Sequence, residues 1–360
     1  MRKYYLDNIR WITILLVVIY HVIMIFSGIL PGMGIPFKDV QYQDGVMYVL
    51  YPWFMILLFI ISGMSSRYYL EKHSVKEFVR ARTRKLLVPS TIGVLVMGCL
   101  QGYVSMSIAN AFDTIPDTLP KPILVMIMIL SGQGVLWFVQ MLWIFSMLLA
   151  LVRRFEKGKL YTLTEKMHII VIILLGIPLW LSGLILNTPV ITVYRFGIYA
   201  FAFFMGYFIF AHDEVIERIS RLKFVFIAGT VILGAVYLCL HFGENFAVMP
   251  LVGSVETVAF AWLTILAIFG STYCWGNKTG NISAYMSSRS WGIYIFHYLC
   301  VSSVALVLRR HTGLSEFPCY LITAIVGVGG SILLYELISR IPVLRWCVLG
   351  IKKEKKNVQG

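Results

Sequence analysis

Charged side chains are scarce in this chain. Lysine and arginine number 31 and aspartate and glutamate 17, together 13% of 360 residues, which is about half the usual share in a globular protein. The residues AVILMFWYC make up 59%, so too little polar material remains to cover a soluble core of that size. The composition excludes an ordinary soluble enzyme and a disordered chain, and it predicts a protein that lies in a lipid bilayer.

Cysteine pairs and metal-ligand spacings are also missing from the sequence. The six cysteines are scattered, and none forms a CxxC pair or a cysteine–histidine spacing that suits zinc. We therefore expect no disulfide framework, no metal site and no permanently bound cofactor.

Long hydrophobic runs are what the sequence has instead. Ten runs are long enough to cross a bilayer as helices, which takes about 20 apolar residues each. Their approximate ranges are Ile9–Ile29, Met47–Met64, Leu86–Ala109, Val135–Val152, His168–Leu186, Ile191–Ala211, Phe224–His241, Leu251–Tyr273, Trp291–Leu308 and Phe317–Ile338. The shorter run Ile123–Leu130 is interpreted as a re-entrant or interfacial piece, or as an early start of the fourth span. The sequence thus predicts an all-α polytopic membrane protein with about ten transmembrane helices.

The distribution of lysine and arginine predicts the orientation. With the N-terminus in the cytoplasm, 25 of these 31 residues fall in cytoplasmic segments, four fall in outer segments, and Arg10 and Arg195 lie within spans. This asymmetry is the positive-inside pattern, and it places both termini in the cytoplasm. The net charge of +14 is then explained by basic loops that face anionic lipid, which removes the reason to expect a nucleic-acid partner.

The domain organisation is predicted to be simple, because no linker and no internal repeat divides the chain. We predict one transmembrane domain over residues 1–346, followed by a basic cytoplasmic tail over residues 347–360. Short loops between the spans favour a bacterial cytoplasmic membrane as the location. The oligomeric state is left open by the sequence.

The first predicted span carries two ionisable side chains, Arg10 and His21. Ionisable residues in a span are costly to bury and are candidates for function. Their separation of 11 residues is three helical turns plus about 20°, so the side chains share a face about 16 Å apart along the axis. This spacing suits an anionic group held at the membrane edge by Arg10 and a proton removed deeper in by His21. The alternatives are that Arg10 snorkels to lipid phosphate and that His21 only packs.

Five short motifs occur in one order over residues 5–297. They are Tyr5-Leu-Asp-Asn-Ile-Arg10 with His21, Phe59-Ile-Ile-Ser-Gly63, Arg82-Thr-Arg-Lys85-Leu-Leu-Val-Pro89, Leu136-Trp-Phe-Val139 and Ser290-Trp-Gly-Ile-Tyr-Ile-Phe-His297. Each resembles a motif of acyltransferase family 3, whose first span carries an Arg-x10-His pattern. Lys85 stands where the family pattern has a second arginine. The ten predicted spans are also the usual number in that family.

The resemblance implies a membrane O-acyltransferase. Members of that family transfer acyl groups, commonly acetyl or succinyl, from cytoplasmic acyl-CoA to hydroxyl groups of glycans or similar acceptors beyond the membrane, and we expect acetyl-CoA as the donor. A carbohydrate hydroxyl is a poor nucleophile, and a positioned neutral imidazole takes its proton as it attacks a thioester. We therefore expect His21 to be the general base and Arg10 to bind a phosphate or orient the thioester. An acyl-His21 intermediate is the rival mechanism.

Further candidate residues lie towards the ends of the spans. Arg82 and Lys85 in the basic loop are expected to bind the phosphates of CoA, although retention of the loop in the cytoplasm explains them equally well. An ammonium group binds phosphate as a point charge, which weakens the argument for Lys85. Arg195 and Glu256 fall about 6–8 Å below the outer edge. Opposite charges at equal depth predict an ion pair or the polar lining of an acceptor cavity.

Three more residues complete the predicted acceptor site. Trp137 lies near the outer face, where it belongs either to the aromatic belt or to a stacking platform for a sugar. Gln140 lies one turn further in and favours a pocket there. His297 lies about 9 Å from the cytoplasmic edge, and both a role in the site and a role in packing are open for it.

The main alternative class is a secondary transporter of a small anionic solute. In such a protein the ionisable residues of the spans would relay protons or bind the anion; they are Arg10, His21, Arg195, Glu256 and Glu336. Transporters usually show repeated halves with matched broken helices, and the sequence shows neither. We therefore predict an acyltransferase whose partners are the lipid bilayer, acyl-CoA and a glycan or similar hydroxyl acceptor.

Overall fold

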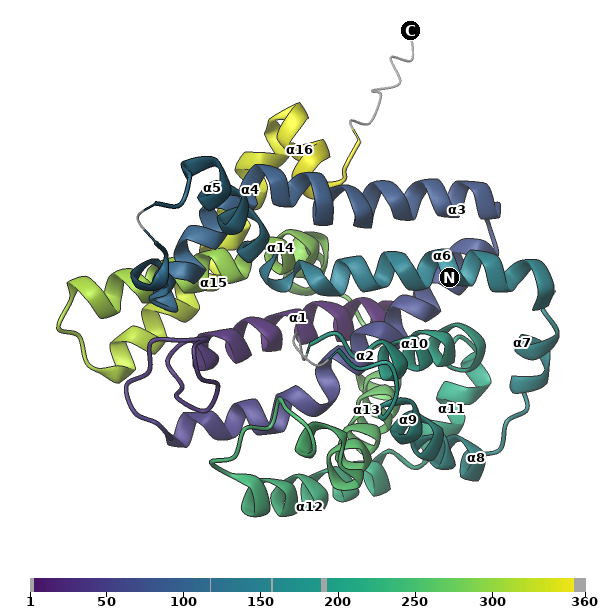
Figure 1. Cartoon of the computed structure of the whole chain (residues 1–360). Coiled ribbons are helices and arrows are strands. Elements are labelled where there is room, and N and C mark those ends of the chain that lie inside the picture. The colour runs from purple at the N-terminus through teal and green to yellow at the C-terminus, as the bar shows by residue number, and fades with distance from the viewer. Residues whose placement is uncertain (1–2, 117, 157, 189–192, 353–360) are drawn as a thin grey trace, which may run out of the picture. The chain divides into compact units, whose positions relative to one another are not determined.

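The fold is helical and divides into two compact units. The computed structural model describes residues 3–116, 118–156, 158–188 and 193–352. One unit comprises Met1–Val75 and Ile144–Ser290, and the other comprises Lys76–Trp143 and Trp291–Gly360. The division falls next to or within three helices, α3 (Val75–Arg82), α6 (Trp137–Glu156) and α14 (Asn281–His311), which are labelled in Figure 1. The sequence predicts a single domain over residues 1–346, and within that range the structure shows two units.

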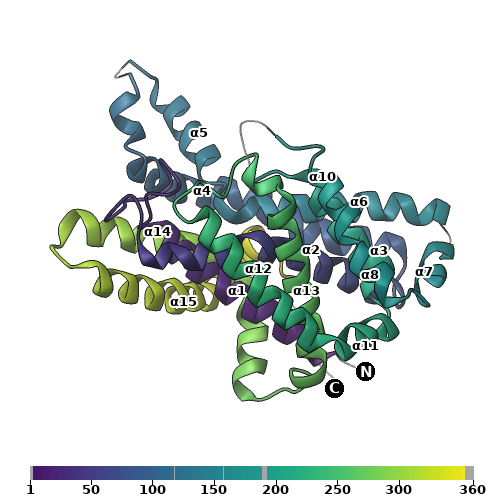
Figure 2. The ribbon, with the colours of Figure 1, turned by 90° about the horizontal axis from the view of Figure 1, so that it is seen from below.

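The first unit contains the helices that carry Arg10 and His21. Its helices are α1 (Tyr4–Met24), α2 (Gly45–Leu70), α7 (Lys159–Thr164), α8 (Ile169–Leu174), α9 (Gly176–Ser182), α10 (Phe196–Met205), α11 (Asp213–Arg221), α12 (Lys223–His241) and α13 (Val255–Trp275), with the short turns η1 (Tyr42–Asp44), η5 (Gly206–Phe210) and η6 (Leu251–Gly253). Helix α2 contacts α1, α10, α12 and α13. Figures 1 and 2 show α12 alongside α13. The unit is therefore organised around α2.

Two glycines allow α2 and α10 to pack closely. A Cβ at Gly63 would overlap the backbone carbonyl of Phe203, and a Cβ at Gly206 would overlap the carbonyl of Ile60. Small residues at such crossings let helix backbones approach each other, which is a main source of helix association in lipid. Gly63 belongs to the motif at residues 59–63, so the structure gives this motif a packing role.

Eight helices among the described residues are long and apolar enough to cross a membrane. They are Tyr4–Met24, Tyr42–Leu70, Val75–Ile108, Gly134–Glu156, Lys223–His241, Val255–Trp275, Asn281–His311 and Glu316–Arg340. A ninth is present if Phe196–Phe210 and Asp213–Arg221, which meet at a bend of 96°, are counted as one span. The chain is therefore an all-α polytopic membrane protein, and the predicted fold class is confirmed.

The fifth predicted span differs from expectation. Residues in the predicted range His168–Leu186 form two short helices, α8 and α9, which meet at Leu175. Pro178 explains the break, because a proline has no N–H to donate and its ring clashes with the carbonyl four residues earlier, here that of Leu174. Hydropathy does not detect this break, since every residue around it except the proline is apolar or glycine.

The second unit contains α4 (Val88–Ile108), α5 (Lys121–Ser131), α15 (Glu316–Arg340) and α16 (Pro342–Leu349), with the turns η2 (Thr83–Leu87), η3 (Ala111–Thr114) and η4 (Gly134–Leu136). A hydrophobic cluster joins α14, α15 and α16; its buried members are Phe296, Ile338, Cys347, Val348 and Leu349. The predicted boundary between domain and tail at residue 346 thus falls inside α16, and the next three residues belong to a packed core.

Helix α5 accounts for the short apolar run that was too short to span. It is separate from α6 and packs against α4, where Gly102 and Gly132 have no room for a side chain: a Cβ on either would overlap a carbonyl of the facing helix. At 11 residues it is about 16 Å long, about half the thickness of the hydrocarbon core. The expectation of an early start to the fourth span is wrong, and a re-entrant or interfacial helix agrees with the structure.

Candidate functional site

Arg10 is held from its own helix and from α2. Its Nη2 donates to Ser65 Oγ at 2.7 Å, and its Nη1 lies 3.6 Å from Asp7 Oδ1, one turn earlier on α1. Ser65 Oγ in turn donates to the carbonyl of Ile61 at 2.8 Å. These contacts fix the position of the guanidinium, which is partly exposed to a cavity.

This cavity is open, lies in the first unit and has a volume of about 720 Å³. Its cationic side chains are Lys3, Arg10 and Lys72, and its acidic ones are Asp7, Glu71, Glu165, Asp213 and Glu214. Lys3 already forms an ion pair with Asp213. The cavity is large enough for a cofactor-sized molecule, but carboxylates outnumber cations on its walls. It therefore suits a polar group more than several phosphates.

Tyr161 and His212, which line the same cavity, belong to a stack of three side chains. The Arg67 guanidinium lies 3.5 Å from the centre of the Tyr161 ring, and the rings of Tyr161 and His212 stack with centres 3.8 Å apart. His212 Nε2–H donates to the Tyr161 carbonyl at 2.8 Å. His212 lies between η5 and α11, outside the membrane-crossing helices, and burial lowers its pKa. The fold thus favours the neutral ring.

The tautomer of His21 follows from its hydrogen bond. Its Nδ1 lies 2.8 Å from the carbonyl oxygen of Val17. Because a carbonyl only accepts, Nδ1 carries the hydrogen, and Nε2 is the accepting nitrogen of a neutral imidazole. Tyr20 meets the ring edge-on, with ring centres 5.1 Å apart. The helix itself therefore orients the imidazole and leaves its basic nitrogen on the other side.

Aromatic side chains lie beside both His21 and Arg195 within the first unit. Tyr20 stacks on Tyr51 with ring centres 5.9 Å apart. The Arg195 side chain forms a hydrogen bond with the Tyr199 side chain, and the Tyr199 ring stacks on Phe59 of α2 with ring centres 4.7 Å apart. His21 and Arg195, which are far apart in sequence, thus each lie beside aromatic side chains that pack on α2.

Arg195 and Glu256 do not form the ion pair that their similar depth suggests. Arg195 is 6% exposed, and its Nε and Nη2 have no hydrogen-bond partner among the described residues. Glu256 lies in the first turn of α13, where its Oε1 is 3.5 Å from Nε2 of His241 at the end of α12. No contact between Arg195 and Glu256 occurs in the described part of the chain, because the carboxylate faces α12.

Arg82 and Lys85 lie in the second unit, each near an aromatic ring. The Arg82 guanidinium is 5.2 Å from the centre of the Phe78 ring, and Lys85 Nζ is 5.6 Å from the centre of the Trp291 ring. Aromatic rings attract cations through their electron-rich faces. These contacts give both side chains a local role in packing, beside the predicted role in donor binding.

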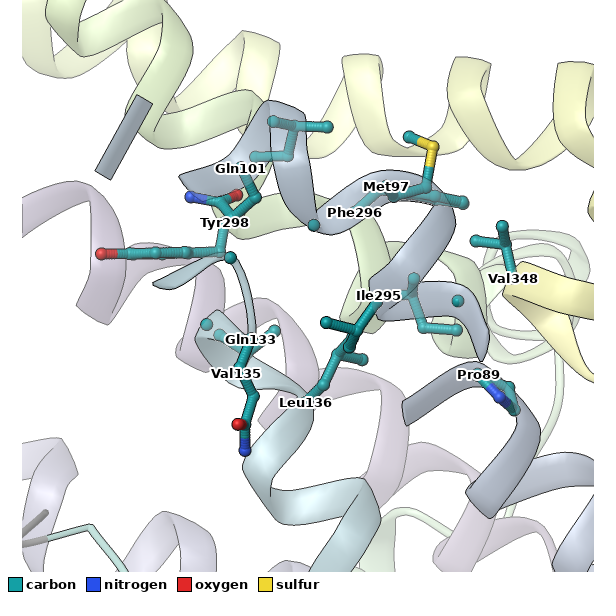
Figure 3. Close-up of a pocket in the computed structure, with 16 residues that line it drawn as sticks. Pro89, Met97, Gln101, Gln133, Val135, Leu136, Ile295, Phe296, Tyr298 and Val348 are labelled. Carbon is teal, nitrogen blue, oxygen red and sulfur yellow. The ribbon is translucent and has the colours of Figure 1, made fainter. Parts of the chain in front are cut away.

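The side-chain amide of Gln140 forms two hydrogen bonds within the second unit. Its Nε2 donates to the Ser90 carbonyl at 3.0 Å, and its Oε1 accepts from Gln133 Nε2 at 2.7 Å. Gln133 also lines the recess shown in Figure 3, whose volume is about 40 Å³. Such a volume holds a few water molecules and not a sugar ring. Trp137, at the start of α6, lies beside Phe138 with ring centres 6.3 Å apart.

His297 is fully buried in α14. Its exposure is 0%, and its Nδ1 lies 2.8 Å from the carbonyl oxygen of Tyr294 and 3.1 Å from that of Ile293. The ring is therefore tied to its own helix by the same type of bond as His21. In this setting a packing role explains the residue as well as a role in the site does.

Comparison with sequence families decides the class of protein. A model of acyltransferase family 3, described as an acyltransferase domain, matches residues 3–336. The chain belongs to acyltransferase family 3. No curated protein and no solved structure matches the chain. The protein is thus a multi-pass membrane enzyme that transfers acyl groups other than aminoacyl groups.

The match to acyltransferase family 3 includes all the residues that we predicted for the site. It also includes residues that the sequence analysis missed: Ser65, which holds Arg10, and Tyr199, which forms a hydrogen bond with Arg195. Ser65 follows Gly63 by two positions and has no pattern that marks it. A tyrosine in a span looks like any other aromatic of the core, so Tyr199 carries no signal in the sequence.

Proposed function

We propose that this acyltransferase transfers an acetyl group from cytoplasmic acetyl-CoA to a hydroxyl group of a glycan or similar acceptor on the outer side of the membrane. His21 is the general base, and Arg10 binds the donor near the membrane edge, so that the thioester end extends towards His21. The observation that carries the proposal is the bond from His21 Nδ1 to the Val17 carbonyl. It supports the proposal because a neutral imidazole that carries its hydrogen on Nδ1 has an accepting Nε2, and a base is needed to activate a hydroxyl.

The proposed reaction is a direct transfer. The acceptor oxygen attacks the carbonyl carbon of the thioester while Nε2 of His21 takes the hydroxyl proton. The carbon–sulfur bond then breaks, CoA leaves as the thiolate, and the proton passes from the imidazolium to that sulfur. The products are the O-acetylated acceptor and CoA, and His21 returns to its neutral form.

The location of Arg10 supports its role with the donor. It lines the 720 Å³ cavity of the first unit, and it lies about 16 Å along α1 from His21. CoA carries its phosphates and its thioester at opposite ends of an extended arm, so a donor entering by this cavity reaches deeper into the span with its reactive end. The cavity walls are more acidic than basic, so this cavity suits the uncharged arm of the donor more than its phosphates; phosphate binding by Arg82 and Lys85 stays a prediction from the sequence.

Acetyl transfer by the purified protein tests the proposal. The protein is incubated with radiolabelled acetyl-CoA and a panel of neutral and acidic oligosaccharides, and the labelled saccharide is counted. We expect labelled product only when an acceptor is present. Label that accumulates on the protein without an acceptor would replace direct transfer by an acyl-His21 intermediate. Absence of label from every acceptor and from the protein would contradict the proposal.

A further inference from the structure

The buried guanidinium of Arg195 has an unused pair of donors. Arg195 is 6% exposed, and neither Nε nor Nη2 has a hydrogen-bond partner among the described residues. The hydrogen bond that Arg195 forms with the Tyr199 side chain brings no negative charge, and a buried charge without an anionic partner strongly destabilises a folded protein. The guanidinium is therefore in the state expected of a binding site whose ligand supplies the missing negative charge.

The arrangement of these donors selects an oxyanion. The Nε–H and one Nη2–H of an arginine lie on the same edge of the guanidinium and point in nearly the same direction. Two parallel N–H groups match the two oxygens of a carboxylate or a phosphate. Arg195 is also the N-cap residue of α10, a helix of 10 residues, and the positive end of a helix dipole further favours an anion there.

A second buried polar atom belongs to the residue whose backbone pairs with Arg195. Asn187 forms an isolated antiparallel bridge with Arg195. Its Nδ2 donates to the Gly183 carbonyl at 2.9 Å, whereas its Oδ1 is buried and has no partner among the described residues. The Oδ1 atom of Asn187 can accept a hydrogen bond from a ligand hydroxyl group, and Nε and Nη2 of Arg195 can donate to an oxyanion of the same ligand.

Arg195 and Asn187 lie between two apolar helices that are each too short to cross the membrane. Helix α9 ends at Ser182, and Phe196–Phe210 begins directly after Arg195. A helix over Phe196–Phe210 is about 22 Å long, about 8 Å less than the hydrocarbon core. Irregular backbone at that depth is tolerated where it is buried in protein or lines a polar cavity. The shortness of the helix thus favours a position of Arg195 below the membrane edge.

We propose that Arg195 and Asn187 bind an anionic sugar acceptor, with the carboxylate or phosphate of the sugar on the Nε–Nη2 edge of Arg195 and a neighbouring hydroxyl on Asn187. The inference rests on the proposed acetyl transfer, and it deepens it by naming the class of acceptor. Both Arg195 and the general base His21 belong to the first unit.

Thermal unfolding in detergent tests anion binding without any measurement of activity. The probes are glucuronate and glucose 6-phosphate, with glucose as the neutral control and potassium chloride at matched ionic strength. We expect both anions to raise the Tm of the wild type by several degrees more than glucose does, and the larger shift to show whether carboxylate or phosphate is preferred. Equal shifts for the anions and for glucose would overturn the proposal.

Two variants test whether the anion-dependent rise in Tm depends on the guanidinium of Arg195. Arg195→Met should abolish the anion-dependent shift and should be at least as stable as the wild type without anions, because it removes an uncompensated charge. Arg153→Met is the matched control. Arg153 is a satisfied arginine that donates to the Tyr207 hydroxyl and to the Leu70 carbonyl, so its loss should lower Tm and leave the anion shift intact. A loss of stability in Arg195→Met like that in Arg153→Met would contradict the proposal.

Gly183→Ala tests whether the anion approaches Nη2 of Arg195 and leaves the charge of Arg195 in place. A Cβ at Gly183 would lie 3.3 Å from Nη2 of Arg195, so alanine crowds the donor without removing the charge. We expect a smaller anion shift than in the wild type. A shift equal to that of the wild type, in a variant that folds, would show that the anion does not approach Nη2.

Acetyl transfer then separates this site from the proposed function. Arg195→Gln should raise the KM for an acidic oligosaccharide about tenfold or more, as expected for the loss of hydrogen bonds to a charged group, and leave the KM for a neutral one unchanged. Transfer that depends on His21 but not on Arg195 would refute the anion site alone. Anion-dependent stabilisation without any acetyl transfer would refute the proposed function alone.

Discussion

Arg10 and His21 differ in how the surrounding protein holds them. Arg10 is held by hydrogen bonds and charge from Ser65 and Asp7 at the wall of a large cavity. His21 is oriented by the hydrogen bond from its Nδ1 to the Val17 carbonyl of its own helix, and we propose its Nε2 as the base. An arginine in this setting can orient a ligand, and a histidine can exchange a proton, so the two side chains suit different steps of one reaction.

The contact between Ser65 and Arg10 gives a prediction for donor binding. Ser65→Ala removes the partner of Nη2, so the guanidinium is less well positioned, and we expect the KM for acetyl-CoA to rise about tenfold. Ser339→Ala is the matched control, because Ser339 Oγ donates only to the Glu336 carbonyl of its own helix. Steady-state kinetics of both variants provide the comparison. A donor KM that is the same in both would show that Ser65 has no part in donor binding.

The identity of the residues at the proposed site was partly readable from the sequence. The spacing of Arg10 and His21 placed them on one face of one helix, which the structure confirms by placing both in α1. The partner of Arg195 was not readable, because depth in the membrane says nothing about direction around a helix. Glu256 lies at a similar predicted depth but turns towards His241.

At the scale of elements, the contact of α2 with α10 is sensitive to substitution, because glycines lie where the two backbones meet. Gly63→Ala places a Cβ against the Phe203 carbonyl, and such overpacking costs about 1–3 kcal/mol. Gly329→Ala is the matched control in α15, since nothing lies within 4 Å of a Cβ there. It should stabilise the helix by about 0.5–1 kcal/mol. Opposite shifts in the free energy of unfolding are expected, and shifts of the same sign would contradict this packing.

The junction of η5 and α11 gives a prediction about pH. Burial lowers the pKa of His212 below its usual 6.5, so below that pH the unfolded chain binds more protons than the folded one. Stability should therefore fall as the pH drops from 7 to 5, by about 1.4 kcal/mol per unit of pKa difference. His212→Gln, which cannot titrate, should show a weaker dependence in thermal unfolding. An unchanged pH dependence would exclude His212 as its source.

Most helices follow directly from hydrophobic runs, and the exceptions have local causes. Eight predicted spans appear as long apolar helices. Pro178 breaks the fifth, and the sixth is short and meets α11 at a bend of 96°. Hydropathy averages over a window and cannot register a single proline or a bend. It also cannot show which helices pack together, so the division into two units was not predictable.

At the scale of the whole molecule, the distribution of basic residues predicts which side each loop faces. In a variant whose exposed cysteines, Cys239 and Cys274, are replaced by serine, Lys38→Cys should react with a membrane-impermeant maleimide added to intact cells. Lys278→Cys should react only after the cells are opened, because its loop is predicted to be cytoplasmic. The reverse pattern would invert the topology and would place the Arg10 cavity outside the cell.

Acetyl transfer by His21 variants tests the central claim most directly. Labelled product is measured for the wild type, His21→Ala and His73→Ala with the same donor and acceptor. His73 is the matched control, because its Nδ1 also lies near the carbonyl four residues earlier, at 3.1 Å from Tyr69 O, but outside the first span. We expect His21→Ala to lower the rate about 10²–10⁴-fold and His73→Ala to leave it unchanged. Equal rates for the wild type and His21→Ala, with both proteins correctly folded, would contradict the account.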